Sequence, residues 1–256
     1  MLKNSTFIIT GAGGRIGYSL TEAIISKGGQ VIIGDINKKK ILQLRNKLGK
    51  EVSEKKLLYY IGDLTKGKNI KKLINNGLRK FKKIDGAIHC MYPKSKGWGD
   101  RFENIKEENL KLDLNNQLGG AIIFSQKILS YFIKAKKGNL IHISSIQGIR
   151  PPKFDHYKNL KMISPLEYTA IKSGIISLTA YLAKYYKNKN LRINCVSPGG
   201  IQSNQPKKFS KRYRSSCNLK GLLDPKDIVD TILFLLSNQS TYINGQNIVV
   251  DDGWSL

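Results

Sequence analysis

Apolar, β-branched runs alternate along this chain with longer segments whose apolar residues repeat at helical spacing. The runs are TFIIT, QVIIGD, LLYYIGD, IDGAIHCM, NLIHISS, RINCVS and QNIVV. Helical patterns between them include IGYSLTEAIISKG, KKILQLRNKLG and the segments near 107–135, 168–187 and 225–237. Strands that are apolar throughout and separated by helices indicate a parallel sheet covered on both faces. We therefore predict an α/β fold with a doubly wound parallel sheet.

The first strand-to-helix connection is rich in glycine. It has the sequence TGAGGRIG and spans Thr10 to Gly17. Small residues there let the chain turn tightly and bring the N–H groups of a helix N-terminus against a pyrophosphate. In doubly wound sheets ligands bind outside the carboxyl ends of the strands, which is where this turn lies. We expect a dinucleotide cofactor that is contacted by Gly11, Gly13, Gly14, Arg15, Ile16 and Gly17.

Asp35 ends the second apolar run. A carboxylate at this place accepts hydrogen bonds from the adenosine ribose hydroxyls and repels a 2′-phosphate. The sequence therefore favours NAD over NADP. Arg15 either donates to a phosphate oxygen, which would partly offset this preference, or points to solvent, so NADP remains an alternative.

The pentapeptide YTAIK opens a helix and places Tyr168 and Lys172 four residues apart. On a helix these side chains project from one face, about one turn apart. A neighbouring ammonium favours the phenolate, so Lys172 and an oxidised nicotinamide together would lower the pKa of Tyr168 toward neutrality. Ser145, at the end of NLIHISS, would hydrogen-bond the substrate oxygen. An isolated YxxxK pair is usually an exposed helical face, and Tyr157 begins a second one where prolines disfavour a continuous helix.

Composition limits the other possibilities. At 256 residues the chain is within the range of one domain. Its apolar runs are shorter than the roughly 20 residues that span a bilayer. The N-terminal apolar stretch is too short and too glycine-bounded for a signal peptide, so we expect a cytoplasmic protein. The three cysteines, Cys90, Cys195 and Cys217, lack metal-ligand spacing, which argues against a disulfide framework or a metal site.

The formal net charge of +26 invites a nucleic-acid or acidic-membrane hypothesis. The excess is nearly all lysine, however, and it is spread along the whole chain with abundant Asn and Ile. This pattern is typical of codon bias in a low-GC genome, so nucleic acid is not the expected partner. One denser cluster, KKFSKRYR at 207–214, would attract an anionic substrate.

In their order and spacing these motifs resemble those of the classical short-chain dehydrogenases/reductases, over nearly the whole chain. The matching segments are TGAGGRIG, GDL with Asp63, HISS with Ser145, YTAIK, NCVSPGGIQS and VVDDGWSL. The resemblance implies a single NAD(P)-binding Rossmann domain over 1–256, with a lid region at about 203–223.

The resemblance also implies a role for each matching residue. Tyr168 would be the general acid/base, Lys172 would bind the nicotinamide ribose and Ser145 would orient the substrate. Asp63 would lie by the adenine, with Leu64 beside it among the cofactor contacts. Ordinary turn chemistry is the alternative for Asp63 and for Ser203. The nicotinamide would be held by Pro198, Gly199, Ile201 and Ser203, the last standing where the family usually has threonine.

The chain departs from the family pattern at several places. Arg15 replaces the middle glycine of the cofactor turn. HCMY at 89–92 replaces NNAG, and we interpret His89 as a hydrogen-bonded structural residue. The family's proton-relay asparagine aligns with Gln117, which could hold a water chain although its reach differs. The stretch 146–167 is longer than usual and would either shape the substrate pocket or form an interface.

That stretch also narrows the comparison, because SIQG, PKFDHY and SPLEYTAIKSGIISLT resemble oxidoreductases of bacterial flagellin-modification and nonulosonate pathways. The resemblance implies an NAD(P)-dependent enzyme that moves a hydride between nicotinamide and a secondary alcohol or ketone, here a sugar or nucleotide-sugar derivative. A 3-oxoacyl thioester is the alternative substrate. A non-catalytic cofactor sensor or a nucleic-acid-binding protein would not need Ser145, Tyr168 and Lys172. By analogy with the family we expect a homodimer or homotetramer.

Overall fold

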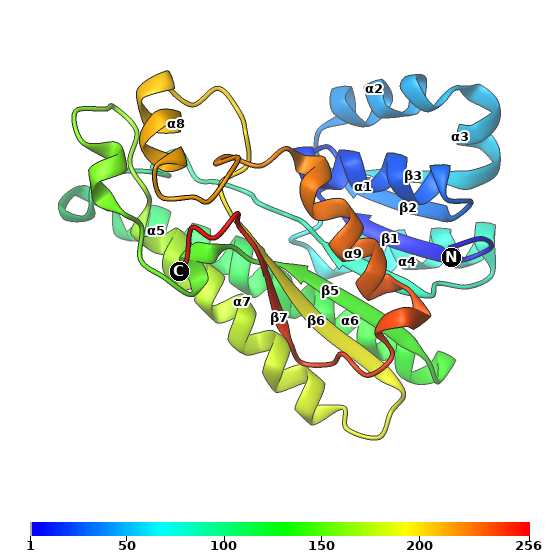
Figure 1. The fold of residues 1–256 in the computed structure, drawn as a ribbon. Coiled ribbons are helices and arrows are strands. Elements are labelled where there is room, and N and C mark those ends of the chain that lie inside the picture. The colour runs from blue at the N-terminus through cyan, green and yellow to red at the C-terminus, as the bar shows by residue number, and fades with distance from the viewer. Residues whose placement is uncertain (1) are drawn as a thin grey trace.

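A seven-stranded parallel sheet with helices on both faces forms the centre of the molecule, as the computed structural model of residues 2–256 shows (Figure 1). The strand order is β3-β2-β1-β4-β5-β6-β7. The strands are β1 (Thr6–Thr10), β2 (Gln30–Asp35), β3 (Leu57–Ile61), β4 (Gly86–His89), β5 (Gly138–Ile143), β6 (Leu191–Pro198) and β7 (Asn247–Val250). The predicted doubly wound parallel sheet is confirmed.

Helices connect the strands at nearly every crossover. They are α1 (Arg15–Ser26), α2 (Lys38–Leu48), α3 (Lys50–Lys56), α4 (Gly67–Phe81), α5 (Glu107–Asp113), α6 (Gly120–Ala135), α7 (Leu166–Tyr185), α8 (Lys207–Arg214) and α9 (Val229–Leu236). Three of these helices, α3, α4 and α8, were not predicted from the sequence. The helix expected near 107–135 is present, but α5 and α6 are joined by a π-helical turn at Leu114–Gly119.

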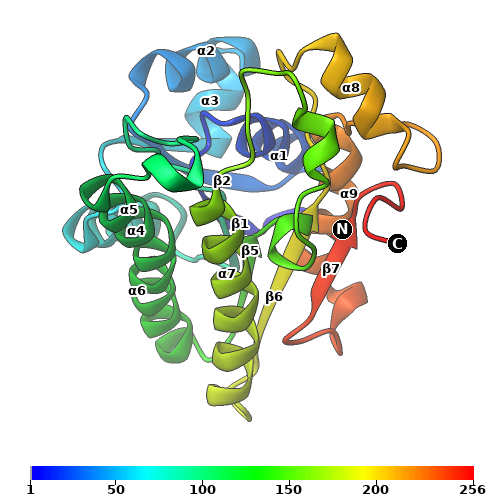
Figure 2. The same ribbon diagram turned by 90° about the vertical axis from the view of Figure 1, so that its left-hand side faces the viewer.

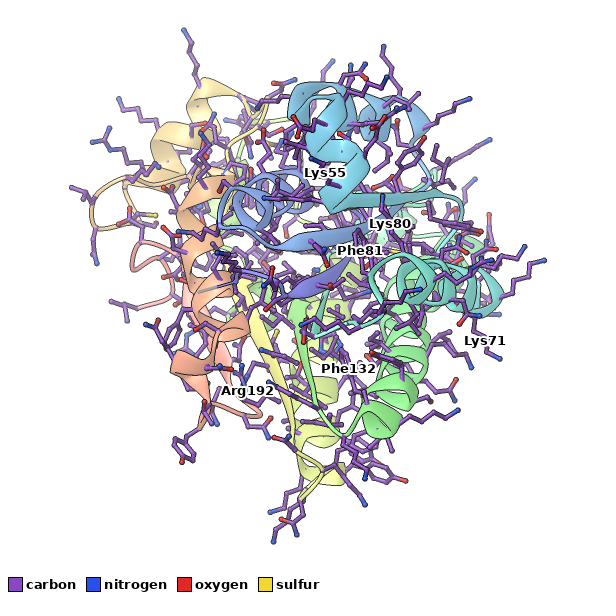
Figure 3. The ribbon with its side chains drawn as sticks, turned by 90° about the vertical axis from the view of Figure 1, so that its right-hand side faces the viewer. Lys55, Lys71, Lys80, Phe81, Phe132 and Arg192 are labelled. Atoms are coloured by element: carbon purple, nitrogen blue, oxygen red, sulfur yellow. The ribbon has the colours of Figure 1, made fainter. Side chains whose placement is uncertain are left out.

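Neighbouring residues of the central strands point to opposite faces of the sheet, so two hydrophobic cores form. Ile9 and Ile33 are fully buried in the core beneath α1 and α9. Ile8 and Ile32, one residue earlier, are buried in the core beneath α4 and α6. This alternation is the period-2 geometry of a strand that is covered on both sides. Figure 2 shows the helices on both faces, and Figure 3 labels Phe132 of α6 within the second core.

The switch point of the sheet lies between β1 and β4. β1 pairs with β2 on one side, where Thr10 is opposite Gly34, and with β4 on the other, where Thr10 is opposite His89. The chain therefore leaves β1 in one direction and returns in the other, and a crevice opens at the carboxyl ends of the strands. The connections that follow β1, β4, β5 and β6 meet at this edge, so they supply the residues of any site there.

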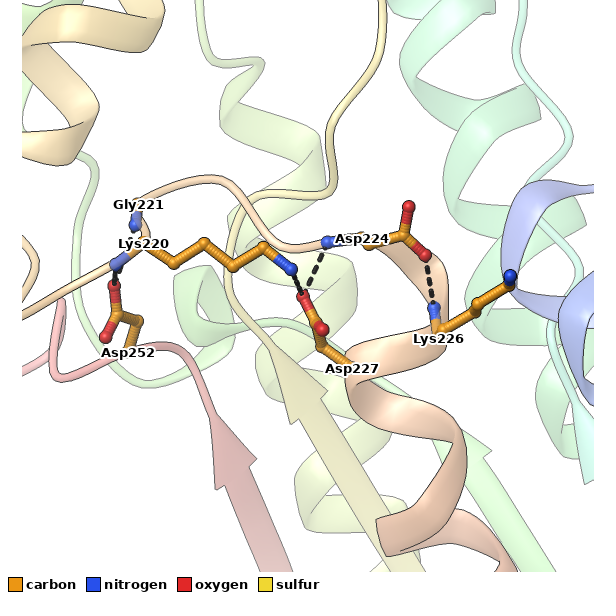
Figure 4. A network of polar contacts seen from close by, with 6 residues as sticks. All are labelled: Lys220, Gly221, Asp224, Lys226, Asp227 and Asp252. Atoms are coloured by element: carbon orange, nitrogen blue, oxygen red, sulfur yellow. Dashed lines mark hydrogen bonds and ion pairs between the residues drawn. The ribbon is translucent and has the colours of Figure 1, made fainter.

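The segment between α8 and α9 is tied to the C-terminal loop (Figure 4). The Asp252 carboxylate accepts hydrogen bonds from the backbone N–H groups of Leu219, at 3.1 Å, and Gly221, at 2.7 Å. Lys220 forms an ion pair with Asp227, and the Asp224 side chain accepts from the Lys226 N–H at 2.9 Å. These contacts fix the end of the region that the sequence analysis named a lid.

Two of the exposed lysines, Lys55 of α3 and Lys71 of α4, are labelled in Figure 3. Two exposed ion pairs, Lys55–Glu51 and Lys111–Glu107, each join residues one helical turn apart. Such pairs contribute only a few tenths of a kcal/mol, roughly 0.3 to 0.5. Over residues 2–256 no helix combines the length and the apolar character needed to cross a membrane.

Candidate active site

The glycine turn after β1 packs so closely that side chains are excluded from it. Gly11 has a φ of +69°, and a Cβ atom there would lie 2.7 Å from the carbonyl oxygen of Cys90. A Cβ atom on Gly17 would lie 2.6 Å from the carbonyl oxygen of Gly11. Glycine at both places lets α1 begin directly against the strand edge. The N–H groups of the first turn of α1 consequently face the crevice, as an anion site requires.

Asp35 fixes this turn from β2. Its carboxylate accepts hydrogen bonds from the backbone N–H groups of Gly13 and Asn37, both at 2.8 Å. Each carboxylate oxygen has a second lone pair, so both can accept a further bond from a ligand hydroxyl. Lys40 of α2 lies near the same turn, because a Cβ atom added to Gly13 would lie 3.2 Å from the Cβ atom of Lys40.

Ser145, Tyr168 and Lys172 are brought together where β5 ends against α7. The Ser145 Oγ accepts a 3.2 Å hydrogen bond from the Gln147 N–H. Lys172 donates from Nζ to the carbonyl oxygen of Ile143 at 3.0 Å, and Ser144 donates from Oγ to the carbonyl oxygen of Lys172 at 2.7 Å. Tyr168 and Lys172 follow Ser145 by 23 and 27 residues in the sequence, yet the three side chains lie on one wall of the site.

Burial controls the acidity of this group. It raises the pKa of the Tyr168 phenol, and the Ser145 hydroxyl opposes part of that rise. Burial also lowers the pKa of Lys172 to about 8. From the sequence, Lys172 was expected to lower the pKa of Tyr168. In the protein without cofactor the pKa of Tyr168 is instead raised. Removing the phenol from water disfavours the phenolate by more than Lys172 favours it.

Two aromatic rings that the sequence analysis missed enclose Tyr168. The ring centroids of Tyr92 and Trp98 lie 5.5 and 6.0 Å from that of Tyr168, and all three pairs are edge to face. The Lys172 ammonium lies 5.6 Å from the Tyr92 centroid and 5.4 Å from the Tyr168 centroid. Tyr92 ends the HCMY segment that replaces the family's NNAG, so the departure itself was the available signal.

A cavity of about 800 Å³ joins the glycine turn to this wall. The predicted residues that line it are Gly11, Gly14, Arg15, Ile16, Gly17, Ser145, Tyr168, Lys172, Pro198, Gly199 and Ile201. Within the described part of the chain, the predicted residues that do not line it are Gly13, Asp35, Asp63, Leu64, Gln117 and Ser203. The cavity is therefore continuous from the candidate cofactor end to the candidate catalytic residues.

The long stretch before Tyr168 also lines the cavity. Its lining residues are Ile146, Gln147, His156, Tyr157, Lys161, Met162, Ile163, Ser164 and Pro165. The stretch holds short 3₁₀ turns at Ile146–Gly148 and Phe154–Tyr157, and no helix continues from Tyr157 to Lys161. Of the two roles expected for this stretch, its position supports the shaping of the pocket.

The basic residues of α8 do not line the cavity, so the attraction of an anionic substrate expected of KKFSKRYR stays a prediction. Phe209 and Tyr213 line the cavity, while Lys207, Lys208 and Lys211 are exposed on the other side of the helix. Arg212 instead donates to the carbonyl oxygen of Lys158 at 2.6 Å and so joins α8 to the long stretch. The cations that line the cavity are Arg15, Lys40, Lys94, Lys161 and Lys172. Among residues 2–256 no Asp or Glu accompanies them there.

The remaining predicted residues have identifiable structural contacts. The Asp63 carboxylate accepts hydrogen bonds from the Thr65 N–H at 2.9 Å and from the Thr65 hydroxyl at 2.6 Å. Burial raises the pKa of Asp63, but these bonds outweigh it and leave the pKa lowered. Leu64 is buried against Gly34 of β2. The exposed Arg15 side chain donates from its guanidinium to the Ser203 hydroxyl. That bond links the glycine turn to the start of the expected lid.

Gln117 lies on the π-helical turn, behind the cavity wall. Its Nε2 donates to the carbonyl oxygen of Pro93 at 2.8 Å, while its buried Oε1 has no partner among the residues described. π-Helical turns are frequent at functional sites. His89, in contrast, has a clear structural setting: it is 2% exposed, its Nδ1 lies 3.0 Å from the Thr10 hydroxyl, and its ring stacks on Phe124.

Comparisons with known proteins agree with this arrangement. A family model described as enoyl-(acyl carrier protein) reductase matches residues 11–255. Post-translational flagellin modification protein A of Campylobacter coli is 41% identical over 257 residues, covering 100% of both chains. A 3-oxoacyl-(acyl-carrier-protein) reductase of Thermotoga maritima is 30% identical, covering 98% of each chain. A crystal structure of a short chain dehydrogenase from Leptospira borgpetersenii with bound NAD⁺ superimposes with a TM-score of 0.87 at 28% identity, covering 100% of this chain and 94% of that one.

Proposed function

The chain belongs to the short-chain dehydrogenase/reductase family and is an oxidoreductase, and from this premise we propose that it moves a hydride between NAD and a secondary alcohol or ketone. One observation carries the proposal: the cavity runs without interruption from the glycine turn to Ser145, Tyr168 and Lys172. A dinucleotide and a small substrate would meet at that wall.

The residues at the glycine turn fit a dinucleotide. Glycine at positions 11 and 17 lets the first turn of α1 lie close against the strand edge, where its backbone N–H groups would bind a pyrophosphate, and Arg15 adds a guanidinium at the same end. Asp35 supports NAD over NADP, because its carboxylate would accept the ribose hydroxyls and repel a 2′-phosphate. Pro198, at the end of β6, and Gly199 and Ile201, which follow it, would hold the nicotinamide end. Bound NAD would supply the hydride acceptor or donor.

The protein's own residues would manage the proton. Tyr168 would take the proton from the substrate hydroxyl during oxidation, or give it to the carbonyl oxygen during reduction. Ser145 would hydrogen-bond the same oxygen and hold it beside the phenol. Lys172 would hold the ribose and place its positive charge next to the phenolate as it forms. Gln117 would connect this group to water, which its unpartnered Oε1 supports.

A sugar or nucleotide-sugar derivative is the substrate that we propose. The full-length similarity to a relative named for flagellin modification supports it, as do the polar side chains of Gln147, Lys161 and Ser164 at the substrate end of the cavity. A 3-oxoacyl thioester is the second candidate, because a relative of 30% identity is named for reduction of such a compound.

The test is cofactor turnover by the purified protein. Oxidation of NADH would be followed with a nucleotide-linked ketosugar and, separately, with acetoacetyl coenzyme A. Turnover with the ketosugar and little with the thioester is expected. The reverse result would assign the second function, and turnover with neither would remove the support for the sugar.

We also propose that residues 1–256 form one cofactor-binding domain in which 203–223 act as a lid. The bond from Arg15 to Ser203 and the 2.6 Å bond from the Gly200 N–H to the Tyr213 hydroxyl support a closed position of this segment. A homodimer or homotetramer remains our expectation for the assembly, and light scattering on the purified protein would determine its mass.

A further inference from the structure

Lys94 places a positive charge against the aromatic rings that enclose Tyr168. Its Nζ lies 4.6 Å from the centroid of the Tyr92 ring and 6.0 Å from that of Trp98. Both rings contact Tyr168 edge to face, at 5.5 and 6.0 Å between centroids. A single aromatic layer therefore separates the Lys94 ammonium from the candidate acid/base.

The backbone on each side of Lys94 is held in place. The Gln117 amide donates to the carbonyl oxygen of Pro93 at 2.8 Å. The buried Asp113 carboxylate accepts from the Ser95 N–H at 2.7 Å and from the Ser95 hydroxyl at 2.6 Å. Lys94 thus stands between two anchored residues, so its backbone is positioned before any ligand arrives.

No acidic group compensates that charge. Across residues 2–256 Lys94 forms neither an ion pair nor a hydrogen bond, and the Asp113 carboxylate, which anchors the same loop, is engaged by Ser95. Burial and the Arg15 guanidinium lower the pKa of Lys94, so an anion beside it would relieve repulsion between like charges. Its side chain is accessible and lines the cavity.

Resting on the proposed oxidoreductase function, we propose that Lys94 binds an anionic oxygen group, a phosphate or a carboxylate, of the substrate. The rings of Tyr92 and Trp98 hold the ammonium in position, and the bound anion places the neighbouring part of the substrate against the wall of Tyr168. The enzyme therefore acts on a charged alcohol or ketone. Lys94 is a binding and specificity residue, and it takes no part in proton transfer.

The experiment measures binding of unreactive probes to the NADH-loaded enzyme by titration calorimetry. The probes are methyl glucoside as the neutral compound, methyl glucuronoside as the carboxylate and glucose 1-phosphate as the phosphate. The wild type is expected to bind at least one anionic probe more tightly than the neutral one. Lys94→Met is expected to weaken that binding roughly tenfold, the usual loss for a charge-assisted bond, and to leave the neutral probe unchanged.

Lys96→Met is the matched control, since Lys96 is on the same loop, carries the same charge and does not line the cavity. It is expected to bind every probe as the wild type does. The proposal is overturned if the wild type shows no preference for either anion, or if the two variants behave alike. It is also overturned if Lys94→Met weakens NADH and spares the probes, because Lys94 would then bind the cofactor. Failure of wild-type protein to bind NADH at all would instead refute the proposed function.

Discussion

The ammonium of Lys172 lies 5.4 Å from the centroid of the Tyr168 ring and donates a 3.0 Å hydrogen bond to the carbonyl oxygen of Ile143. A neutral carbonyl, rather than a carboxylate, holds this buried cation in place. The charged form of Lys172 is consequently disfavoured, and burial lowers its pKa to about 8. Burial also disfavours the phenolate of Tyr168. The two charged forms, ammonium and phenolate, are therefore most favourable when they are present together and attract each other.

Lys172 should make stability depend on pH. Its pKa is about 8 in the folded protein against an ordinary value of 10.5. Between these values the unfolded chain binds the extra proton, so wild-type stability should rise with pH relative to Lys172→Met. The full gain is roughly 3 kcal/mol. Urea unfolding of both proteins without cofactor at about pH 7, 9 and 11, which bracket the folded and unfolded pKa values, would measure it. A difference that stays constant with pH would show that Lys172 titrates normally.

Gly17→Ala should weaken both the fold and the cofactor site. The added Cβ would lie 2.6 Å from the carbonyl oxygen of Gly11 and 2.7 Å from the Cα of Ala12, and both are backbone atoms that cannot move freely. We expect a loss of about 1–3 kcal/mol in unfolding free energy, with weaker NADH binding in a fluorescence titration. Gly67→Ala is the control, because its nearest contacts are at an ordinary 3.4 Å. Equal behaviour of the two variants would refute the close packing of the turn.

Asp35→Asn should change the cofactor preference. The substitution keeps one acceptor oxygen but removes the charge that would bind the ribose hydroxyls and repel a 2′-phosphate. The Kd for NADH is expected to rise roughly tenfold, while that for NADPH rises less or falls. Asp230→Asn, an exposed change on α9, should alter neither Kd. An unchanged preference in Asp35→Asn would mean that Arg15 or a lysine from 38–40 determines it.

Local pattern predicted the fold and much of the candidate site. Apolar strands and the glycine turn are short-range features, so the sheet and its carboxyl edge followed from them. The amphipathic pattern of α4 was also present, with Ile70, Leu73 and Ile74 on one face, but the sequence analysis did not use it. The orientation of α8 was likewise available: Phe209 and Tyr213, four residues apart, must share the buried face, so its lysines must face away.

The rest depends on contacts between segments distant in sequence. Tyr92 and Trp98 meet Tyr168 because the loop after β4 folds back over α7, and no pattern within that loop specifies this. The pKa of Lys172 is likewise set by burial between β5 and α7 rather than by its spacing from Tyr168. Lys94 appears in the sequence as one lysine among many, and its place in the cavity against Tyr92 and Trp98 distinguishes it from Lys96.

The central claim is that Tyr168 is the acid/base of an NAD-linked oxidoreductase, and Tyr168→Phe tests it most directly. The change removes one hydroxyl and keeps the ring that packs against Tyr92 and Trp98. We expect NADH to bind as before and kcat for ketone reduction to fall at least 100-fold, within the range of about 10² to 10⁴ for a lost general acid. Tyr181→Phe, on the same helix and 64% exposed in the native protein, should keep full activity. Loss of turnover in Tyr168→Phe alone would support the account, and wild-type turnover in that variant would contradict it.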